Sequence, residues 1–241
     1  MNQAIQAVAE RYGLTTCPPP QEFIPIGIPA LDAVTGGIPK GRIVDIHGAE
    51  DAGKTALALT LAKGSVLYID AENKLDLRMI QGRKSFYIAH LETLEDALEV
   101  CRIAAAGFDT IVLDTVEAIP EAWDPWITIT EPRENSREKL LSKALAILAP
   151  ILLFNSCTLI VVNQMRAVPG IFHYELDHST GGRALGYFAS LRLEVRLIES
   201  VKKNDKRIGQ KIRVRVEKNK HGRPAGEAML TIDYRRGLCG K

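Results

Sequence analysis

The sequence predicts an α/β fold in which a mostly parallel, twisted sheet is flanked by helices and carries antiparallel strands at its C-terminal edge. From Gly41 onward, short apolar segments alternate with segments of helical character. These apolar segments are nearly continuous, which is typical of parallel strands buried on both faces. After Ala184 the pattern changes to a period of two, which is typical of antiparallel strands with one face in water.

The composition fits one large domain or a domain with a small appendage. The chain has 241 residues, 46% of them hydrophobic and 25% charged, with a net charge of +2. A nucleic-acid partner would therefore have to meet a local basic face. The cysteines form no CxxC pair, which argues against a zinc site or a disulfide framework and suits a reducing cytosol. We expect a cytoplasmic protein with no signal peptide and no membrane contact.

The alternating part of the chain predicts strands and helices in strict succession. The helix after residue 92 should be capped by Thr93, with Asp96 in the reciprocal capping position. The apolar stretch around Pro150 is better explained by a helix end and a buried strand than by a membrane span. Strands are expected at residues 42–47, 65–70, 85–89, 110–114 and 158–163, and helices at 54–63, 93–106 and 136–148.

The two ends of the chain differ from this core. Apolar and charged residues alternate over residues 191–197 and 212–217, which places Arg192, Arg196, Arg213 and Arg215 on the wet face of an antiparallel pair. A last strand is expected near residues 229–232. Residues 2–12 predict a short amphipathic helix, followed by a proline-rich linker at 15–21. Such a helix is marginal alone, so it should dock on its own domain or on a neighbouring subunit.

A phosphate-binding loop provides the strongest functional signal. Its sequence matches G-x-x-x-x-G-K-[ST] between a predicted strand and a predicted helix. Backbone N–H groups of such a loop wrap phosphates, and the helix N-terminus adds a favourable dipole. Lys54 should reach the β- and γ-phosphates, and the Thr55 hydroxyl should bind Mg²⁺. The loop predicts a site for ATP with Mg²⁺, formed by Gly48, Ala49, Glu50, Asp51, Ala52, Gly53, Lys54 and Thr55.

Polar residues end several of the neighbouring strands. Asp114 ends an apolar strand and should hold Mg²⁺ together with Thr55. Glu72 is placed either to orient the attacking water or to cap a helix. Gln164 could sense the γ-phosphate and pass that state to the long loop that follows, residues 165–180. Phe172 in this loop could stack on bases or serve local packing.

Taken together, these residues resemble the bacterial RecA recombinase family. The resemblance extends over about residues 25–238, with the blocks in the same order and spacing. Besides the phosphate-binding loop, they are 41–48 (GRIVDIHG), 68–73 (YIDAEN), 111–116 (IVLDTV), 162–166 (VNQMR), 179–185 (STGGRAL), 189–196 (ASLRLEVR) and 216–220 (VEKNK). The resemblance implies a RecA-like ATPase core at 25–241, with residues 1–24 serving subunit docking.

The resemblance also implies roles in ATP hydrolysis. Glu72 would be the catalytic carboxylate, and Gln164 the switch between nucleotide and DNA. Lys218 and Lys220 would reach the γ-phosphate held by the adjacent subunit, so that the active site is complete only at a subunit interface. Ala56, Asp76 and Met79 would add contacts to the nucleotide.

Two loops, residues 120–137 and 165–180, would correspond to the DNA-binding loops of a helical filament. The implied partners are single-stranded and double-stranded DNA and further copies of the chain, in a filament rather than a ring. The implied DNA contacts are Arg166, Phe172, Gly181, Gly182, Arg183, Lys139, Arg196, Arg213 and Arg215.

Several departures from the family pattern bear on this expectation. The first loop lacks the usual glycine-rich character, Pro169 stands where a branched aliphatic residue is usual, and Met79 stands where an aromatic often stacks on adenine. The sequence is expected to be a compact form without the C-terminal lobe. An accessory ATPase on the same core is therefore the main alternative to a recombinase. A hexameric ring and a metabolic P-loop kinase fit the sequence less well.

Overall fold

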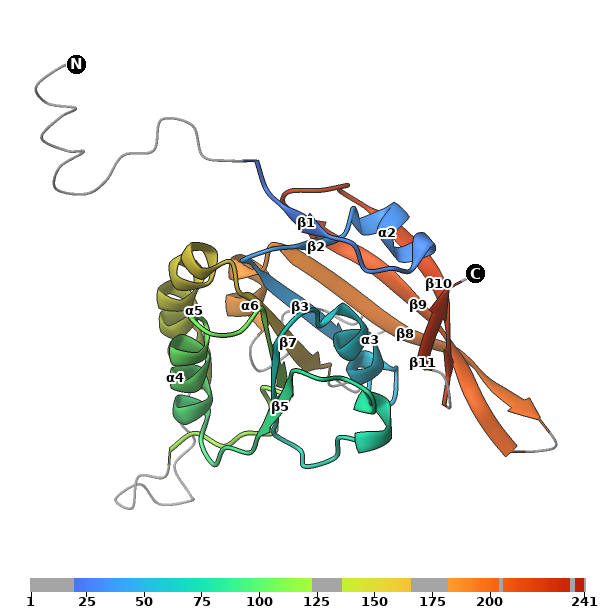
Figure 1. Ribbon diagram of the computed structural model, residues 1–241, viewed down its shortest axis with the longest axis horizontal. Helices are drawn as coiled ribbons and strands as arrows, with labels where there is room; N and C mark the ends of the chain where they lie inside the picture. Colours follow the sequence, from blue (N-terminus) through green and yellow to red (C-terminus); the bar gives the residue numbers. More distant parts are fainter. Residues whose placement is uncertain (1–19, 123–135, 166–181, 204–205, 235–236, 241) are drawn as a thin grey trace, which may run out of the picture.

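The computed structural model describes residues 20–122, 136–165, 182–203, 206–234 and 237–240. A central sheet carries helices on both sides, and its C-terminal strands extend beyond the helical layers (Figure 1). The predicted helix at 2–12, nearly all of the linker and most of both DNA loops lie outside the described residues. The division at residue 24 therefore stays a prediction.

Nine strands among the described residues form the main sheet, in the order β11-β10-β9-β8-β3-β7-β6-β4-β5. From β8 to β5 in this order, neighbouring strands are parallel. The strands β9, β10 and β11 add antiparallel pairs at one edge, which confirms the predicted fold class. The strands are β3 (Ile43–Gly48), β4 (Val66–Asp70), β5 (Phe86–Ala89), β6 (Thr110–Asp114), β7 (Thr158–Gln164), β8 (Leu191–Lys203), β9 (Lys206–Asn219), β10 (Gly226–Asp233) and β11 (Gly237–Gly240).

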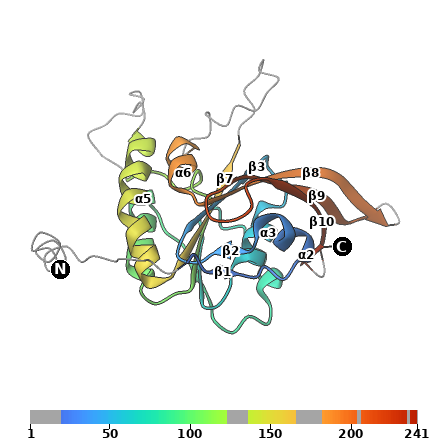
Figure 2. The same cartoon turned by 90° about the horizontal axis from the view of Figure 1, so that it is seen from above.

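The helices cover the two faces of this sheet in separate groups. Leu31 of α2 and most of α3 pack on one face, whereas α4, α5 and α6 pack on the other. Figure 2 shows α2 and α3 on one side of the sheet and α5 and α6 on the other. No helix among the described residues is long and apolar enough to cross a membrane. The helices are α2 (Pro29–Thr35), α3 (Lys54–Leu61), α4 (Leu94–Ala104), α5 (Ser136–Asn155) and α6 (Gly182–Phe188), with a 3₁₀ turn, η1, at Leu77–Ile80.

Parallel pairing brings the functional strand ends to one edge of the sheet. Gly48 at the end of β3 lies opposite Gln164 at the end of β7. Asp70 at the end of β4 lies opposite Asp114 at the end of β6. Because carboxyl ends of parallel strands meet at the same edge, residues from four strands can form one site.

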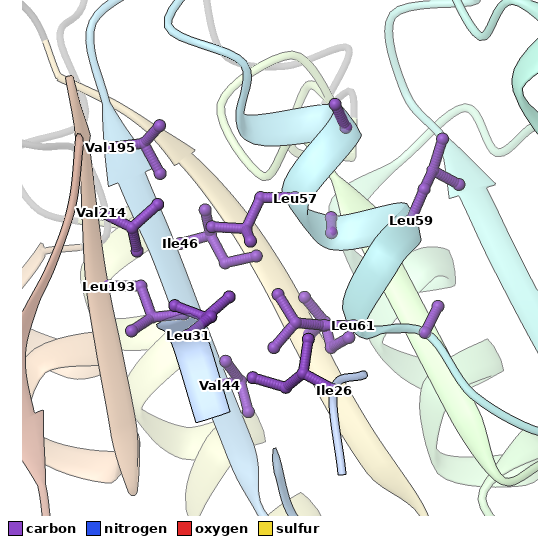
Figure 3. Close-up of a cluster of buried hydrophobic side chains, with 14 of the residues drawn as sticks. Ile26, Leu31, Val44, Ile46, Leu57, Leu59, Leu61, Leu193, Val195 and Val214 are labelled. Carbon is purple, nitrogen blue, oxygen red and sulfur yellow. The ribbon is translucent and has the colours of Figure 1, made fainter. Parts of the chain in front are cut away.

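The core under α3 anchors the phosphate-binding loop. Leu57 and Leu61 on α3 point toward Val44 and Ile46 on β3 (Figure 3), and all four side chains are buried. Burying a leucine of this kind stabilises the fold by about 2 kcal/mol. The strand before the loop and the helix after it are thereby fixed to each other.

Helix α5 is longer than predicted, because it continues to Asn155 instead of ending at residue 148. Pro150 lies inside the helix, where a proline costs about 3 kcal/mol. The buried stripe on α5 includes Leu145 and Leu148 and continues to Leu152 beyond the proline. Packing of this stripe against the sheet offsets the cost of the proline.

Helix α4 begins at the predicted cap with one difference. The Thr93 hydroxyl oxygen accepts a hydrogen bond from the Asp96 backbone N–H at 3.1 Å. The Asp96 carboxylate accepts from the Thr93 hydroxyl at 2.6 Å, not from the Thr93 backbone as the reciprocal arrangement predicts. The side chains therefore satisfy each other at this end of the helix.

The C-terminal part differs from the prediction in two respects. The strand near residues 229–232 is present as β10 but is not the last, since β11 pairs with it. Arg192 does not face water: its side chain is 12% exposed and its Nε lies 2.8 Å from Asp45 Oδ2. The alternation predicted the correct face of the sheet for Arg192, but α6 covers that face at this position. The short elements β1 (Phe23–Ile24), α2 and β2 (Ile38–Pro39) were not predicted, because elements this short carry little periodic signal.

Candidate nucleotide-binding site

The phosphate-binding loop connects β3 to α3 as predicted. Gly53 precedes the helix in the left-handed region, with φ 95°. A Cβ at Gly53 would lie 2.5 Å from Ile232 Cδ1, and one at Gly48 would collide with the Val195 carbonyl oxygen. Gly48 is therefore required by the close approach of the β8 backbone, and Gly53 by its left-handed backbone conformation. The first turn of α3 directs its free N–H groups toward the loop, which suits an anion.

Lys54 lies folded across this loop. Its Nζ donates a hydrogen bond to the Ala49 carbonyl at 2.7 Å, and the residue is 6% exposed. Burial lowers the pKa of Lys54, and nearby carboxylates led by Asp114 oppose that shift. A buried ammonium group at the N-terminus of a helix can neutralise a bound phosphate with little competition from water.

Asp114 joins two elements at the metal position. Its Oδ2 accepts from the Thr55 hydroxyl at 2.6 Å and from the Tyr68 hydroxyl at 2.5 Å. Burial raises the pKa of Asp114, while the two hydroxyl bonds oppose the rise. Hydroxyl and carboxylate oxygens are hard donors, so this pair fits Mg²⁺. The sequence prediction paired Thr55 with Asp114 but missed Tyr68, whose buried hydroxyl orients the carboxylate.

Glu72 and Gln164 meet although 92 positions separate them. The Gln164 amide donates to Glu72 Oε1 at 2.6 Å, and Lys74 Nζ lies 2.9 Å from the other carboxylate oxygen, Oε2. Glu72 follows β4, and Gln164 ends β7. Asp70, just before Glu72, shapes this turn by accepting from the backbone N–H groups of Lys74 and Leu75. Asp70, and not Glu72, thus holds the local backbone, which leaves the Glu72 carboxylate directed toward Gln164.

These side chains line one cavity of about 520 Å³. One wall consists of the phosphate-binding loop and the ends of β4, β6 and β7. Met79 lies on the rim, 41% exposed, and the Asp76 carboxylate caps η1 and pairs with Arg78 at 2.7 Å. The opposite wall was not predicted and comes from the C-terminal strands, with Gln210 and Tyr234 joined through their side chains at 3.3 Å. Among the lining residues are Glu50, Asp51, Gly53, Lys54, Thr55, Ala56, Glu72, Met79, Asp114, Gln164, Arg207, Gln210, Ile232 and Tyr234.

Glu117 is a further buried acid close to this site that sequence reasoning missed. Burial raises the pKa of Glu117 to about 7, and its carboxylate accepts from the Thr115 hydroxyl at 3.0 Å. A hydrogen bond from the Gln164 backbone opposes the rise. Glu117 lies three residues after Asp114 in the segment TVEAI, and no periodic signal there distinguishes it from a loop acid.

Lys218 and Lys220 are not among the described residues that line the cavity of their own chain. Both contact the C-terminal end of α6. Lys218 Nζ donates to the carbonyls of Gly186 and Tyr187 at 2.5 and 3.0 Å, and Lys220 Nζ to the latter at 3.4 Å. Burial, together with the neighbouring cations Lys220 and Arg192, lowers the pKa of Lys218 to about 8.

The predicted DNA contacts are only partly described. Arg166, Phe172 and Gly181 lie outside the described residues. Gly182 begins α6, Arg183 follows it at the surface, and Lys139 is exposed on α5.

The basic residues on the C-terminal strands are partly paired with acids. An Arg196 Nη2 lies 2.5 Å from Glu194, and an Arg213 Nη1 lies 3.9 Å from Glu227. Arg215 is exposed. The face is therefore mixed in charge, more so than the alternation of arginines indicated.

Fold and site together define a P-loop nucleotide-binding domain, with the loop, candidate metal-binding oxygens and a candidate catalytic carboxylate at one edge of a parallel sheet. The family model for the RecA N-terminal domain matches residues 19–239. The chain belongs to the RecA N-terminal domain family.

Curated relatives support this assignment. Protein RecA of Clostridium beijerinckii is 36% identical over 219 residues, which cover 85% of this chain and 61% of that protein. Protein RecA of Aquifex aeolicus is 36% identical over 232 residues, covering 90% and 67%. Protein RecA of Thermus thermophilus is 34% identical over 260 residues, covering 99% and 76%. The chain thus spans about six tenths to three quarters of the length of these relatives.

Proposed function

We propose that this chain is an ATP-dependent DNA recombinase, which assembles on single-stranded DNA and promotes pairing and strand exchange with homologous duplex DNA. The observation that carries the proposal is the 2.6 Å bond between Gln164 and Glu72 beside the phosphate-binding loop. It joins the candidate catalytic carboxylate to the residue that leads into the predicted DNA-binding loop. Such a bond lets nucleotide state and DNA contact influence each other.

ATP hydrolysis is assigned to the residues around the loop. Backbone N–H groups from Gly48 to Thr55 and the Lys54 ammonium would hold the phosphates. Mg²⁺, held by Thr55 and Asp114, would neutralise charge on the phosphate oxygens when bound. Glu72 would accept a proton from the attacking water and so orient it toward the phosphate.

Gln164 would act as the sensor. In the structure its amide is engaged by Glu72, the carboxylate that must be free to orient water. A γ-phosphate oxygen close to Gln164 could compete for the same amide hydrogens. If the Gln164 amide donated to the phosphate instead of Glu72, the Glu72 carboxylate would be released. The start of the segment after Gln164 would then be displaced.

The lysine pair supports a shared site. Because Lys218 and Lys220 lie away from the cavity of their own chain, a nucleotide that they contact would have to be bound to a neighbouring subunit. We assign them to the γ-phosphate of that neighbour, so that assembly would complete the pocket. Helical filaments of this chain, docked in part through residues 1–24, are the proposed assembly, and the cytoplasm is the proposed compartment.

The proposed DNA interface combines described and undescribed residues. Arg183 and Lys139 are exposed at the surface, and Arg196, Arg213 and Arg215 line the outer face of the C-terminal strands. Arg166, Phe172, Gly181 and Gly182 belong to the same proposed interface. Contacts of this kind with phosphates weaken steeply as salt rises.

One experiment tests the function. ATP turnover is measured with and without single-stranded DNA, and the same samples are imaged by electron microscopy. The proposal predicts turnover that depends on DNA, together with extended filaments on it. In the Glu72→Gln variant turnover should fall by about 10²-fold or more while ATP binding remains, since a general base contributes that much. Glu92→Gln, the same substitution at an exposed glutamate that is not among the cavity-lining residues, serves as the matched control.

The other outcomes each favour another reading. Rings in the micrographs would favour a ring ATPase. DNA-independent turnover by monomers would contradict both assemblies. DNA-dependent turnover without strand exchange in a pairing assay would indicate an accessory ATPase.

A further inference from the structure

A cluster of ionised groups lies buried between the sheet and α6. Asp45 and His47 on β3 are 0% and 1% exposed. Asp45 Oδ2 lies 2.8 Å from Arg192 Nε on β8 and 3.2 Å from His47 Nδ1. The other ring nitrogen, His47 Nε2, lies 3.0 Å from Glu217 Oε2 on β9. Burying charges is costly unless they are paired, so this cluster links three neighbouring strands.

The surroundings of His47 favour its charged form. Its two ring nitrogens lie 3.2 and 3.0 Å from carboxylate oxygens of Asp45 and Glu217, and these negative charges stabilise a protonated imidazole. Neither contact of His47 has the alignment of a hydrogen bond, so charge attraction holds His47, whereas Arg192 Nε donates a hydrogen bond to Asp45 Oδ2 at 2.8 Å. Burial lowers the pKa of His47, but Asp45 and Glu217 outweigh burial and raise it to about 9.

Glu217 occupies an irregular position in the sheet. Arg192 pairs with Lys218 and Leu193 with Val216, so Glu217 is the extra residue of a β-bulge. In a regular strand, successive side chains point to opposite faces. The bulge lets both Glu217 and Lys218 reach the α6 side, where Glu217 contacts His47 and Lys218 contacts the carbonyls of α6.

The cluster therefore lies between two functional segments. His47 immediately precedes Gly48, where the phosphate-binding loop begins. Glu217 immediately precedes Lys218, whose ammonium is held on the last carbonyls of α6. A loss of the attraction between His47 and Glu217 would remove an ion pair that restrains the bulge.

We propose that His47 is a positioning residue, which fixes the Glu217 bulge and thereby places Lys218 for the nucleotide site of the neighbouring subunit. This inference rests on the proposed function, in which Lys218 acts across the subunit interface. Its distinctive consequence is that His47 acts on ATP hydrolysis in the adjacent chain rather than in its own.

Mixed assemblies test this consequence with two inactive variants. A donor chain carries Glu72→Gln, so it binds ATP without cleaving it and still offers Lys218. An acceptor chain carries Lys218→Ala and keeps its own Glu72. Each alone should be inactive with single-stranded DNA, whereas the mixture should hydrolyse ATP at donor–acceptor junctions.

His47→Gln is then placed in either chain of the mixture. In the donor it should lower turnover by about 10- to 100-fold, the effect of misplacing a catalytic group. In the acceptor it should leave turnover at the level of the parent mixture. An equal loss in both placements, or a loss from the acceptor alone, would overturn the positioning role.

Two controls keep the outcomes distinct. His90→Gln, an exposed histidine, should have no effect in either chain. If His47→Gln does not fold, Glu217→Gln replaces it in the same two placements, and the same asymmetry is expected. A parent mixture without activity would contradict the shared site itself. An active mixture whose turnover does not depend on where His47→Gln is placed would contradict only the positioning role of His47.

Discussion

At the scale of single residues, Asp114 and Glu72 differ in how they are restrained. Asp114 is held by two hydroxyls, of which Thr55 was predicted and Tyr68 was not. Glu72 is held by Gln164 and Lys74. The pairing of Thr55 with Asp114 was predicted because the phosphate-binding loop and the end of β6 both lie at the carboxyl edge of a parallel sheet, whereas the contacts of Glu72 with Gln164 and Lys74 were not predicted. Tyr68 was missed because its hydroxyl reaches Asp114 across strands, and no spacing in the sequence encodes that reach.

Glu117 provides a test of the electrostatics at this scale. Its pKa in the folded protein is about 7, above the ordinary value of 4.5, because the carboxyl is buried. As pH rises, Glu117 therefore loses its proton in the unfolded chain before it does so in the folded protein. The free energy of unfolding falls progressively between pH 4.5 and pH 7 as a result. The cost stays constant above pH 7 and amounts to up to about 3 kcal/mol at 1.36 kcal/mol per pKa unit.

Glu117→Gln should remove this cost. The gain in the free energy of unfolding over the parent should be largest at pH 8 and nearly absent at pH 4.5, measured by urea denaturation at both values. Other titrating groups cancel in the comparison. If the difference in the free energy of unfolding between variant and parent were the same at both pH values, the raised pKa of the buried Glu117 carboxyl would be contradicted.

At the scale of elements, α5 shows where a local rule is overridden. Pro150 predicted an early helix end, but the apolar stripe that continues to Leu152 keeps the chain helical. Conversely, the β-bulge at Glu217 could not be read from the alternation of residues 212–217, because the pattern does not reveal where one residue is left out of the pairing. Strong periodicity thus predicted which elements exist, whereas packing determined their ends and irregularities.

Two substitutions in α5 separate these effects. Leu152→Ala should destabilise the protein by about 2–5 kcal/mol, because it leaves a cavity under the helix. Pro150→Ala, on the exposed side, should stabilise it by about 3 kcal/mol or less, because alanine restores a backbone donor. Thermal unfolding of both variants measures the difference, and destabilisation by Pro150→Ala would show that the proline is required by the fold.

At the scale of the whole molecule, the nucleotide cavity has two walls of different origin. The parallel strands supply the phosphate-binding loop, Asp114, Glu72 and Gln164. The antiparallel strands supply Gln210 and Tyr234 on the opposite wall, and place Lys218 on the outside. The first wall could be predicted from motifs at strand ends. The second could not, because β10 approaches Gly53 only through the tertiary fold.

In the proposed assembly, one chain holds an incomplete ATP site that a neighbour completes. ATP turnover per chain, measured with excess single-stranded DNA over a wide range of protein concentrations, tests this sharing directly. We expect turnover per chain to rise with concentration and then level off, and dilution to abolish it as subunits separate. Turnover per chain that stays constant from the highest to the lowest concentration would contradict the shared site.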